Sequence, residues 1–197
     1  RDLHSFPTRR SSDLSSATCT AAFLAAQAVM TLSNADKVLI PDISLSKAYL
    51  ATMLLGRHGG SALFEKIIKN SAQSLCKKFG SNLEHAERIA GFSDVLFNAL
   101  KDAYSLSRLD RLYLETAALL HNVGYFIGSN DHHKHTAHII ENSEIAGLSR
   151  KDMQIIAQIA RYHTKSSPKA THPDFMRLDA ADRVTVTRVA SFLRIAD

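Results

Sequence analysis

Histidines are concentrated in one short stretch of this chain. Five of the ten lie within eighteen residues: His121, His132, His133, His135 and His138. An apolar run leads directly into the first of them, and Gly124 and Gly128 follow it. Histidine is a common ligand of transition metals and the usual proton carrier near neutral pH. This stretch is therefore the candidate centre of any chemistry that the chain performs.

Polar side chains also occur where helical periodicity calls for apolar ones. His85 falls on an apolar helix face, and His121 and Asn122 follow two leucines. Asp197 lies on the apolar face of the last expected helix. Burying such groups unpaired costs about 1–3 kcal/mol each. Two arrangements remain open: the side chains hydrogen-bond to one another, or they share a metal ion.

The elements that must position these residues are helices. Helical periodicity is expected over 62–79, 84–100, 107–121, 132–143, 149–163 and 182–197, with a loop over 165–173. Capping signals begin three of these helices, at Ser81–Glu84, Ser107–Asp110 and Ser149–Asp152. Six or so helices with short connections predict an all-α bundle.

The first sixty residues follow a different pattern. Residues 1–14 resemble a translated sequencing adapter and are expected to be a disordered artefact. Helices are predicted over 15–32 and 45–55, with a short strand at Lys37–Pro41 between them. Glycines at 56–60 mark a predicted boundary. The expected domains are therefore a small α/β segment at 15–58 and a helical domain at 61–197.

Composition limits the class of protein. The formal charge of +5 and the pI of about 9.3 suit an anionic partner. Basic motifs interleaved with aromatic residues are absent, which argues against nucleic acid. Two cysteines without a CxxC motif suit a reducing cytoplasm. No apolar run approaches the length of about 20 residues needed to span a bilayer.

The order His, His-Asn, Asp on successive helices resembles the HD superfamily, whose members hold one or two divalent metals. A longer set of motifs is similar to the HD-like domain of the Ppx/GppA family, the exopolyphosphatases and guanosine pentaphosphate phosphohydrolases. These motifs are Leu119–Ile127, His132–His135, Ile139–Ser143, Gly147–Ser149, Ile159–His163, Pro168 and Leu193–Asp197. The similarity covers roughly residues 61–197, and 15–55 resemble the end of the preceding actin-like ATPase-fold domain.

The resemblance implies that the chain is a fragment of a phosphohydrolase that cleaves terminal phosphoanhydrides of polyphosphate or pppGpp. The family's phosphatase centre lies in the actin-like domains, so none of its residues can be assigned here. The fragment alone is expected to be inactive. The longer parent is expected to be a homodimer, and the HD-like domain to serve substrate channelling, regulation or dimer contacts.

The chain departs from the HD pattern at Asn122, where the family motif has aspartate. An amide supplies no negative charge and bridges two cations poorly. The favoured expectation is a degenerate HD site whose side chains hydrogen-bond to one another; the alternative is a single divalent ion, Mg²⁺ or Mn²⁺, bound more weakly than with aspartate. Its candidate ligands are His85, His121, Asn122 and Asp197, with His133 and His163 as further candidates. Lys134, Arg161 and Lys165 are the candidate anion-binding residues.

Two alternatives compete with this interpretation. One is an independent HD-type metal-dependent phosphohydrolase that acts on nucleotides or phosphoesters. The other is a non-catalytic helical module for dimerisation or anion binding. Bound metal would favour the first alternative, and anion binding without turnover would favour the second.

Overall fold

The computed structural model describes residues 24–25, 27–32, 60–164 and 166–197. The chain divides into two units, residues 1–41 and 42–197. In the first unit, residues 24–25 and 27–32 are helical, as predicted for this segment. The expected strand Lys37–Pro41 and the expected helix over 45–55 lie outside the described residues. The predicted α/β segment and its boundary at 56–60 therefore stay predictions.

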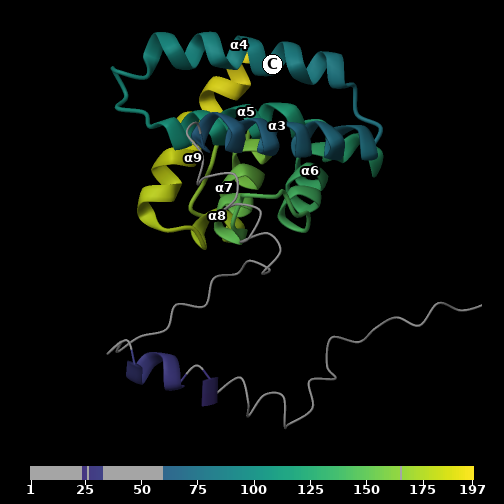
Figure 1. Ribbon diagram of the computed structural model, residues 1–197. Coiled ribbons are helices and arrows are strands. Elements are labelled where there is room, and N and C mark those ends of the chain that lie inside the picture. Colours follow the sequence, from purple (N-terminus) through teal and green to yellow (C-terminus); the bar gives the residue numbers. More distant parts are fainter. Residues whose placement is uncertain (1–23, 26, 33–59, 165) are drawn as a thin grey trace, which may run out of the picture. The chain divides into compact units, whose positions relative to one another are not determined.

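The second unit consists of helices throughout its described part (Figure 1). Their bounds are α3 Gly60–Lys78, α4 Leu83–Leu100, α5 Arg108–Leu120, η1 Val123–Phe126, α6 His132–Glu141, α7 Arg150–Arg161, α8 Pro173–Met176 and α9 Ala180–Ala196. No strand occurs in the described ranges, which confirms the all-α prediction. Within those ranges, no helix combines the length and hydropathy that a bilayer crossing requires.

Two of the three predicted capping signals act as expected. The Ser107 side chain accepts from the Asp110 backbone N–H, and the Asp110 side chain accepts from the N–H of Ser107. Ser149 and Asp152 repeat this reciprocal arrangement at α7. At α4 the cap is Asn82, whose side chain accepts from the backbone N–H of His85 at 3.0 Å. The helix therefore begins one residue later than the Ser81 signal indicated.

Helix α5 occupies the centre of the helical domain, between α4 and α7 (Figure 1). It packs against α3, α4, α7 and α9. Eight of its thirteen residues are buried, including Leu114, Leu119 and Leu120. Burying one leucine completely contributes about 1.5–3 kcal/mol. The core thus forms around the helix that ends just before His121.

A close backbone approach holds α6 against the turn after His121. The Thr136 hydroxyl donates to the His121 carbonyl oxygen at 2.9 Å and accepts from the Gly124 N–H at 2.9 Å. A Cβ atom at position 124 would overlap the carbonyl oxygen of His132 and the backbone nitrogen of Thr136. Glycine is therefore needed at 124 for this approach, and its φ is not in the left-handed region.

Two short helices were not expected. Residues 123–126 form the 3₁₀ helix η1. Helix α8 begins at the last residue of the loop expected over 165–173, before the helix that was expected to start at residue 182. Pro173 opens α8, which suits proline because its missing N–H would be unpaired in a first turn. Both helices are only four residues long, too short to show helical periodicity.

Candidate functional site

His121 follows directly after α5 and is completely buried. Its Nδ1 lies 2.6 Å from the carbonyl oxygen of Ala118, one helical turn earlier. A carbonyl oxygen only accepts, so Nδ1 carries the proton and the neutral ring keeps a lone pair on Nε2. The end of the helix therefore sets both the tautomer of His121 and the direction of its free nitrogen.

Two other side chains meet this nitrogen. His85 lies in the first turn of α4, and Asp197 caps the end of α9. Oδ1 of Asp197 is 3.4 Å from Nε2 of His121 and 3.5 Å from Nε2 of His85. One ligand atom from each of the three residues lies within 4.8 Å of the others. The yellow end of α9 and its C-terminus lie beside α4 in Figure 1, which brings these distant positions together.

The polar atoms of this three-residue cluster are incompletely paired. Nε2 of His121 is buried and has no hydrogen-bond partner in the described part of the chain. Its 3.4 Å separation from Asp197 is an electrostatic contact without hydrogen-bond geometry. A bound cation would suit both the lone pair and the carboxylate. Two imidazole nitrogens and one carboxylate oxygen are donors that Mn²⁺, Fe²⁺ and Zn²⁺ accept.

The electrostatics of Asp197 agree with this arrangement. The pKa of its carboxyl lies below the usual value, chiefly because the His121 side chain, when Nε2 carries a proton, donates toward it across 3.4 Å, which is longer than a regular hydrogen bond. Burial opposes this shift, while the nearby rings of His163 and His85 add to it. Asp197 is therefore a carboxylate at neutral pH and supplies the negative charge that a cation requires.

Imidazoles continue beyond this cluster. His163 is buried, and its Nδ1 lies 2.5 Å from the Ala160 carbonyl oxygen, so its Nε2 is also left unprotonated. Its ring centroid is 5.2 Å from that of His121, and its Nε2 is 3.3 Å from Nε2 of His132. Burial lowers the pKa of His163 to about 4, with smaller lowering contributions from His121 and His132. His163 is therefore neutral at pH 7.

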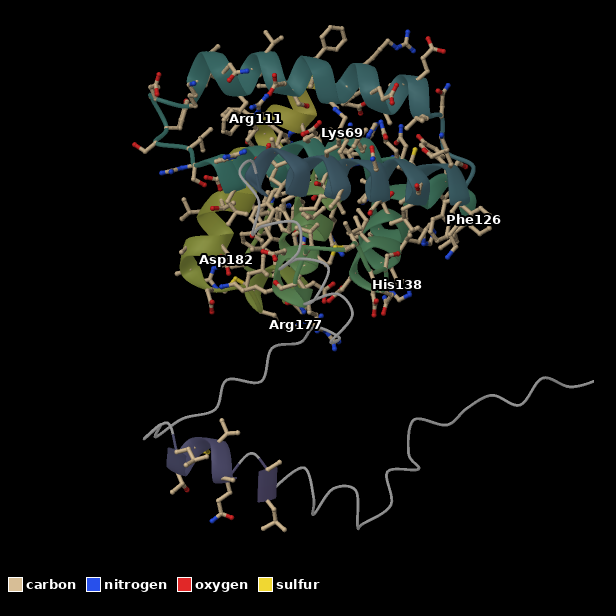
Figure 2. The ribbon with its side chains drawn as sticks, viewed as in Figure 1. Lys69, Arg111, Phe126, His138, Arg177 and Asp182 are labelled. Atoms are coloured by element: carbon tan, nitrogen blue, oxygen red, sulfur yellow. The ribbon has the colours of Figure 1, made fainter. Side chains whose placement is uncertain are left out.

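The histidines of α6 are divided between the site and the surface. His132 faces His163 and stacks on Tyr125, with ring centroids 4.2 Å apart. His133, the candidate from the sequence, meets the edge of the His132 ring at 5.8 Å and is not part of the three-residue cluster. His138 is exposed on the outer side of α6 (Figure 2). Sequence reasoning thus missed His132 as the partner of His163.

Asn122 follows His121 of the three-residue cluster directly in the chain. It precedes η1, and its side chain makes no capping hydrogen bond. It lines a hollow together with Phe79, Asn82, Tyr125 and Phe126. Its role as a metal ligand stays a prediction.

The candidate anion-binding residues are partly engaged by carboxylates. Nζ of Lys134 is 3.0 Å from Asp131, and Arg161 lies 3.5 Å from Asp174. Lys165 lies outside the described residues. The positive charge of the two described residues is therefore partly neutralised locally.

Comparison with known proteins places this geometry in a family. The model of Ppx/GppA phosphatase domain III matches residues 67–196. A guanosine-5'-triphosphate,3'-diphosphate pyrophosphatase of Pseudoalteromonas translucida is 27% identical over 135 residues, which are 68% of this chain and 26% of that protein. Proteins of the same name from Aeromonas hydrophila and Aeromonas salmonicida are each 33% identical over 90 residues, 45% of this chain and 18% of theirs.

The chain therefore spans about a quarter or less of the length of these relatives. The family match covers His85 on α4, His121 after α5 and His163 after α7, and ends one residue before Asp197. It also agrees with the motifs on which the resemblance rested. The chain belongs to the Ppx/GppA phosphatase family.

Proposed function

We propose that this chain is part of a cytoplasmic, homodimeric phosphohydrolase that removes terminal phosphate from pppGpp or polyphosphate. Family membership and the names of the relatives support the phosphohydrolase part of this assignment. In this proposal residues 61–197 are the HD-like domain, and 15–58 are the end of the domain that carries the phosphatase centre. Residues 1–14 are an artefact and take no part in the function.

The described domain, in this proposal, holds one divalent cation between His85, His121 and Asp197. The observation that carries it is the buried Nε2 of His121, which faces the Asp197 carboxylate without a hydrogen bond. The nitrogen-rich donor set favours Mn²⁺ over Mg²⁺, because Mg²⁺ prefers oxygen ligands. When bound, the cation would supply positive charge to phosphate oxygens.

The chain's own residues prepare this site before any ion binds. The Ala118 carbonyl oxygen holds a proton on Nδ1 of His121, so Nε2 is the ring nitrogen that faces the site as a ligand atom. Burial keeps His163 uncharged beside it, which avoids a positive charge next to the cation. Asn122 in place of aspartate leaves no bridging carboxylate, so one ion rather than two is proposed.

Metal content tests the cation site. The purified chain, loaded with Mn²⁺ and dialysed, should retain about one ion per molecule, measured by mass spectrometry of the metal. Asp197→Asn should lower the affinity at least tenfold to a hundredfold, because a charged ligand is lost. His138→Ala is the matched control, since His138 is exposed and distant from the cluster. Equal retention by the Asp197→Asn protein and the unmodified chain would refute the cation site.

Phosphate release tests the division of labour. The 197-residue chain should not release phosphate from pppGpp or polyphosphate at an enzymatic rate, whereas the longer protein should. The second candidate function, an independent HD-type phosphohydrolase, is favoured by the additional inward-facing imidazoles of His132 and His163. It predicts Mn²⁺-dependent turnover of a nucleotide or phosphoester by the chain alone, abolished by His121→Ala.

A further inference from the structure

A hollow lies beside the three-residue cluster, between the α3–α4 turn and η1. Its lining includes Phe79, Ser81, Asn82, Asn122, Tyr125 and Phe126. Figure 2 shows Phe126 at the edge of the domain, so the hollow is reached from outside. Most of its lining consists of three aromatic rings and two carboxamides, with Gly80 and Ser81 beside them, and none of these residues carries a formal charge.

The aromatic rings are exposed but held in place. Phe126 is 65% exposed and Tyr125 is 51% exposed. One face of Tyr125 stacks on His132 at 4.2 Å, with an angle of 10° between the rings. Phe126 and Phe79 form a T-shaped pair with ring centroids 5.3 Å apart. Exposed aromatic rings held in fixed orientations are the usual platform on which proteins stack nucleobases.

The two carboxamides have unused hydrogen-bonding groups. Oδ1 of Asn82 accepts from the backbone N–H of His85, and the two N–H donors on Nδ2 take no part in this hydrogen bond. The Asn122 side chain makes no capping bond, and no hydrogen bond of it occurs among the described residues. A carboxamide presents a donor and an acceptor side by side, which matches the edge of a purine base.

Two lining residues adjoin members of the three-residue cluster, and a third contacts His132. Asn82 caps the turn that carries His85, Asn122 follows His121 in the chain, and Tyr125 stacks on His132. A base in the hollow would thus lie next to the chain segments that carry His85 and His121. We infer that the hollow binds the purine base of a nucleotide, with the phosphates directed to His85, His121 and Asp197. The direction of the phosphates rests on the proposed function; the base site rests on the hollow itself.

Calorimetric titration of the full chain in Mn²⁺ with guanosine 5′-diphosphate and with inorganic pyrophosphate tests the inference. The two ligands carry the same number of phosphates, so the difference isolates the nucleoside, and the Phe126 variant then tests the base within it. Guanosine diphosphate should bind at least tenfold more tightly, as expected for one stacked base. Phe126→Ala should remove about tenfold of that affinity and leave pyrophosphate binding unchanged. Asn82→Ser, which keeps a capping oxygen but removes the amide, should also weaken the nucleotide selectively.

Phe92→Ala is the matched control, because Phe92 is 59% exposed on α4 and does not line the hollow. It should change neither affinity. Equal affinity for the two ligands, or nucleotide binding that Phe126→Ala leaves intact, would overturn the base site. Pyrophosphate binding without nucleotide preference would leave the cation proposal standing. Phe126-dependent nucleotide binding by a chain that retains no Mn²⁺ would remove the cation proposal and leave the base site standing.

Discussion

The two ends of the α5–α7 pair differ in how completely their polar side chains are hydrogen-bonded. Near the start of α7, Asp152 accepts hydrogen bonds from Tyr113 on α5 and from the N–H and hydroxyl of Ser149. At the other end of the two helices, His121 and His163 turn their Nε2 atoms toward other side chains. There the buried Nε2 of His121 has no hydrogen-bond partner in the described part of the chain.

The difference lies in what each end can use. Helix N-termini need acceptors for free N–H groups, and Ser149 and Asp152 supply them. Helix C-termini leave free carbonyls, and those of Ala118 and Ala160 each bind the Nδ1 of a histidine three residues later. This arrangement points two imidazole lone pairs inward. One end therefore stabilises the fold, while the other end has ligand atoms left for binding.

The largest expected effect is a loss of stability from a substitution at the end of the pair that carries His121 and His163. Gly124→Ala places a Cβ against the backbone of α6, which cannot move without displacing His132. We expect a loss of about 3 kcal/mol in the free energy of unfolding, measured with urea. Gly91→Ala is the control, because nothing lies within 4 Å of a Cβ there; it should stabilise α4 by about 0.5–1 kcal/mol. Equal stability of the two variants would contradict the close approach of α6.

The next largest effect is expected in the pH dependence of stability, to which His163 at the histidine end contributes. The pKa of His163 is lowered from 6.5 to about 4 by burial, so the folded state binds the proton less well than the unfolded state. Its contribution is complete above pH 6.5 and is lost as pH falls toward 4, by up to about 3 kcal/mol. Unfolding of wild type and His163→Gln between pH 7 and 4 measures it. An unchanged slope in the variant would assign the dependence to other groups.

Restoring a carboxylate should sharpen the contrast at the histidine end. Asn122→Asp adds a negative charge next to His121 without changing the size of the side chain. We expect Mn²⁺ to bind about tenfold more tightly, equivalent to about 1.4 kcal/mol. Equilibrium dialysis of both proteins at pH 7 measures the change. An unaltered affinity would mean that position 122 does not face the ion.

The smallest effect is expected at the capped end. Tyr113→Phe removes one hydrogen bond, but Asp152 still accepts from Ser149, so the loss should be about 1 kcal/mol. Burial, then the bond to Asp152, raises the pKa of Tyr113 above its usual value. Wild-type stability should therefore decline above about pH 10, where the unfolded tyrosine ionises. Tyr113→Phe should show a weaker decline in urea titrations at pH 9 and 11.

Local signals predicted much of the helical domain. Helical periodicity indicated the all-α fold, and the Ser107–Asp110 and Ser149–Asp152 signals placed two helix starts correctly. These features depend on residues within one or two turns of each other, so the sequence carries them directly. The sequence also contains the charges of Lys134 and Arg161, but it did not predict their pairing with Asp131 and Asp174.

The sequence could not choose between His132 and His133. Each lies four residues before a buried position of α6, Thr136 or Ala137, so both fit the helical pattern. The placement of α6 against the turn at Gly124 directs His132 to His163. The sequence could not predict the hollow beside Asn122 either, because its walls come from two segments far apart in the chain, the α3–α4 turn and η1.

The sequence by itself determined the six long helices of the domain, the family and the residues whose polarity is out of place on apolar faces: His85, His121 and Asp197. Only the tertiary structure decided that these three meet at one carboxylate oxygen. Their convergence requires α9 to return beside α4 and the C-terminal end of α5. That arrangement depends on packing between helices far apart in the chain, and local periodicity contains no information about it.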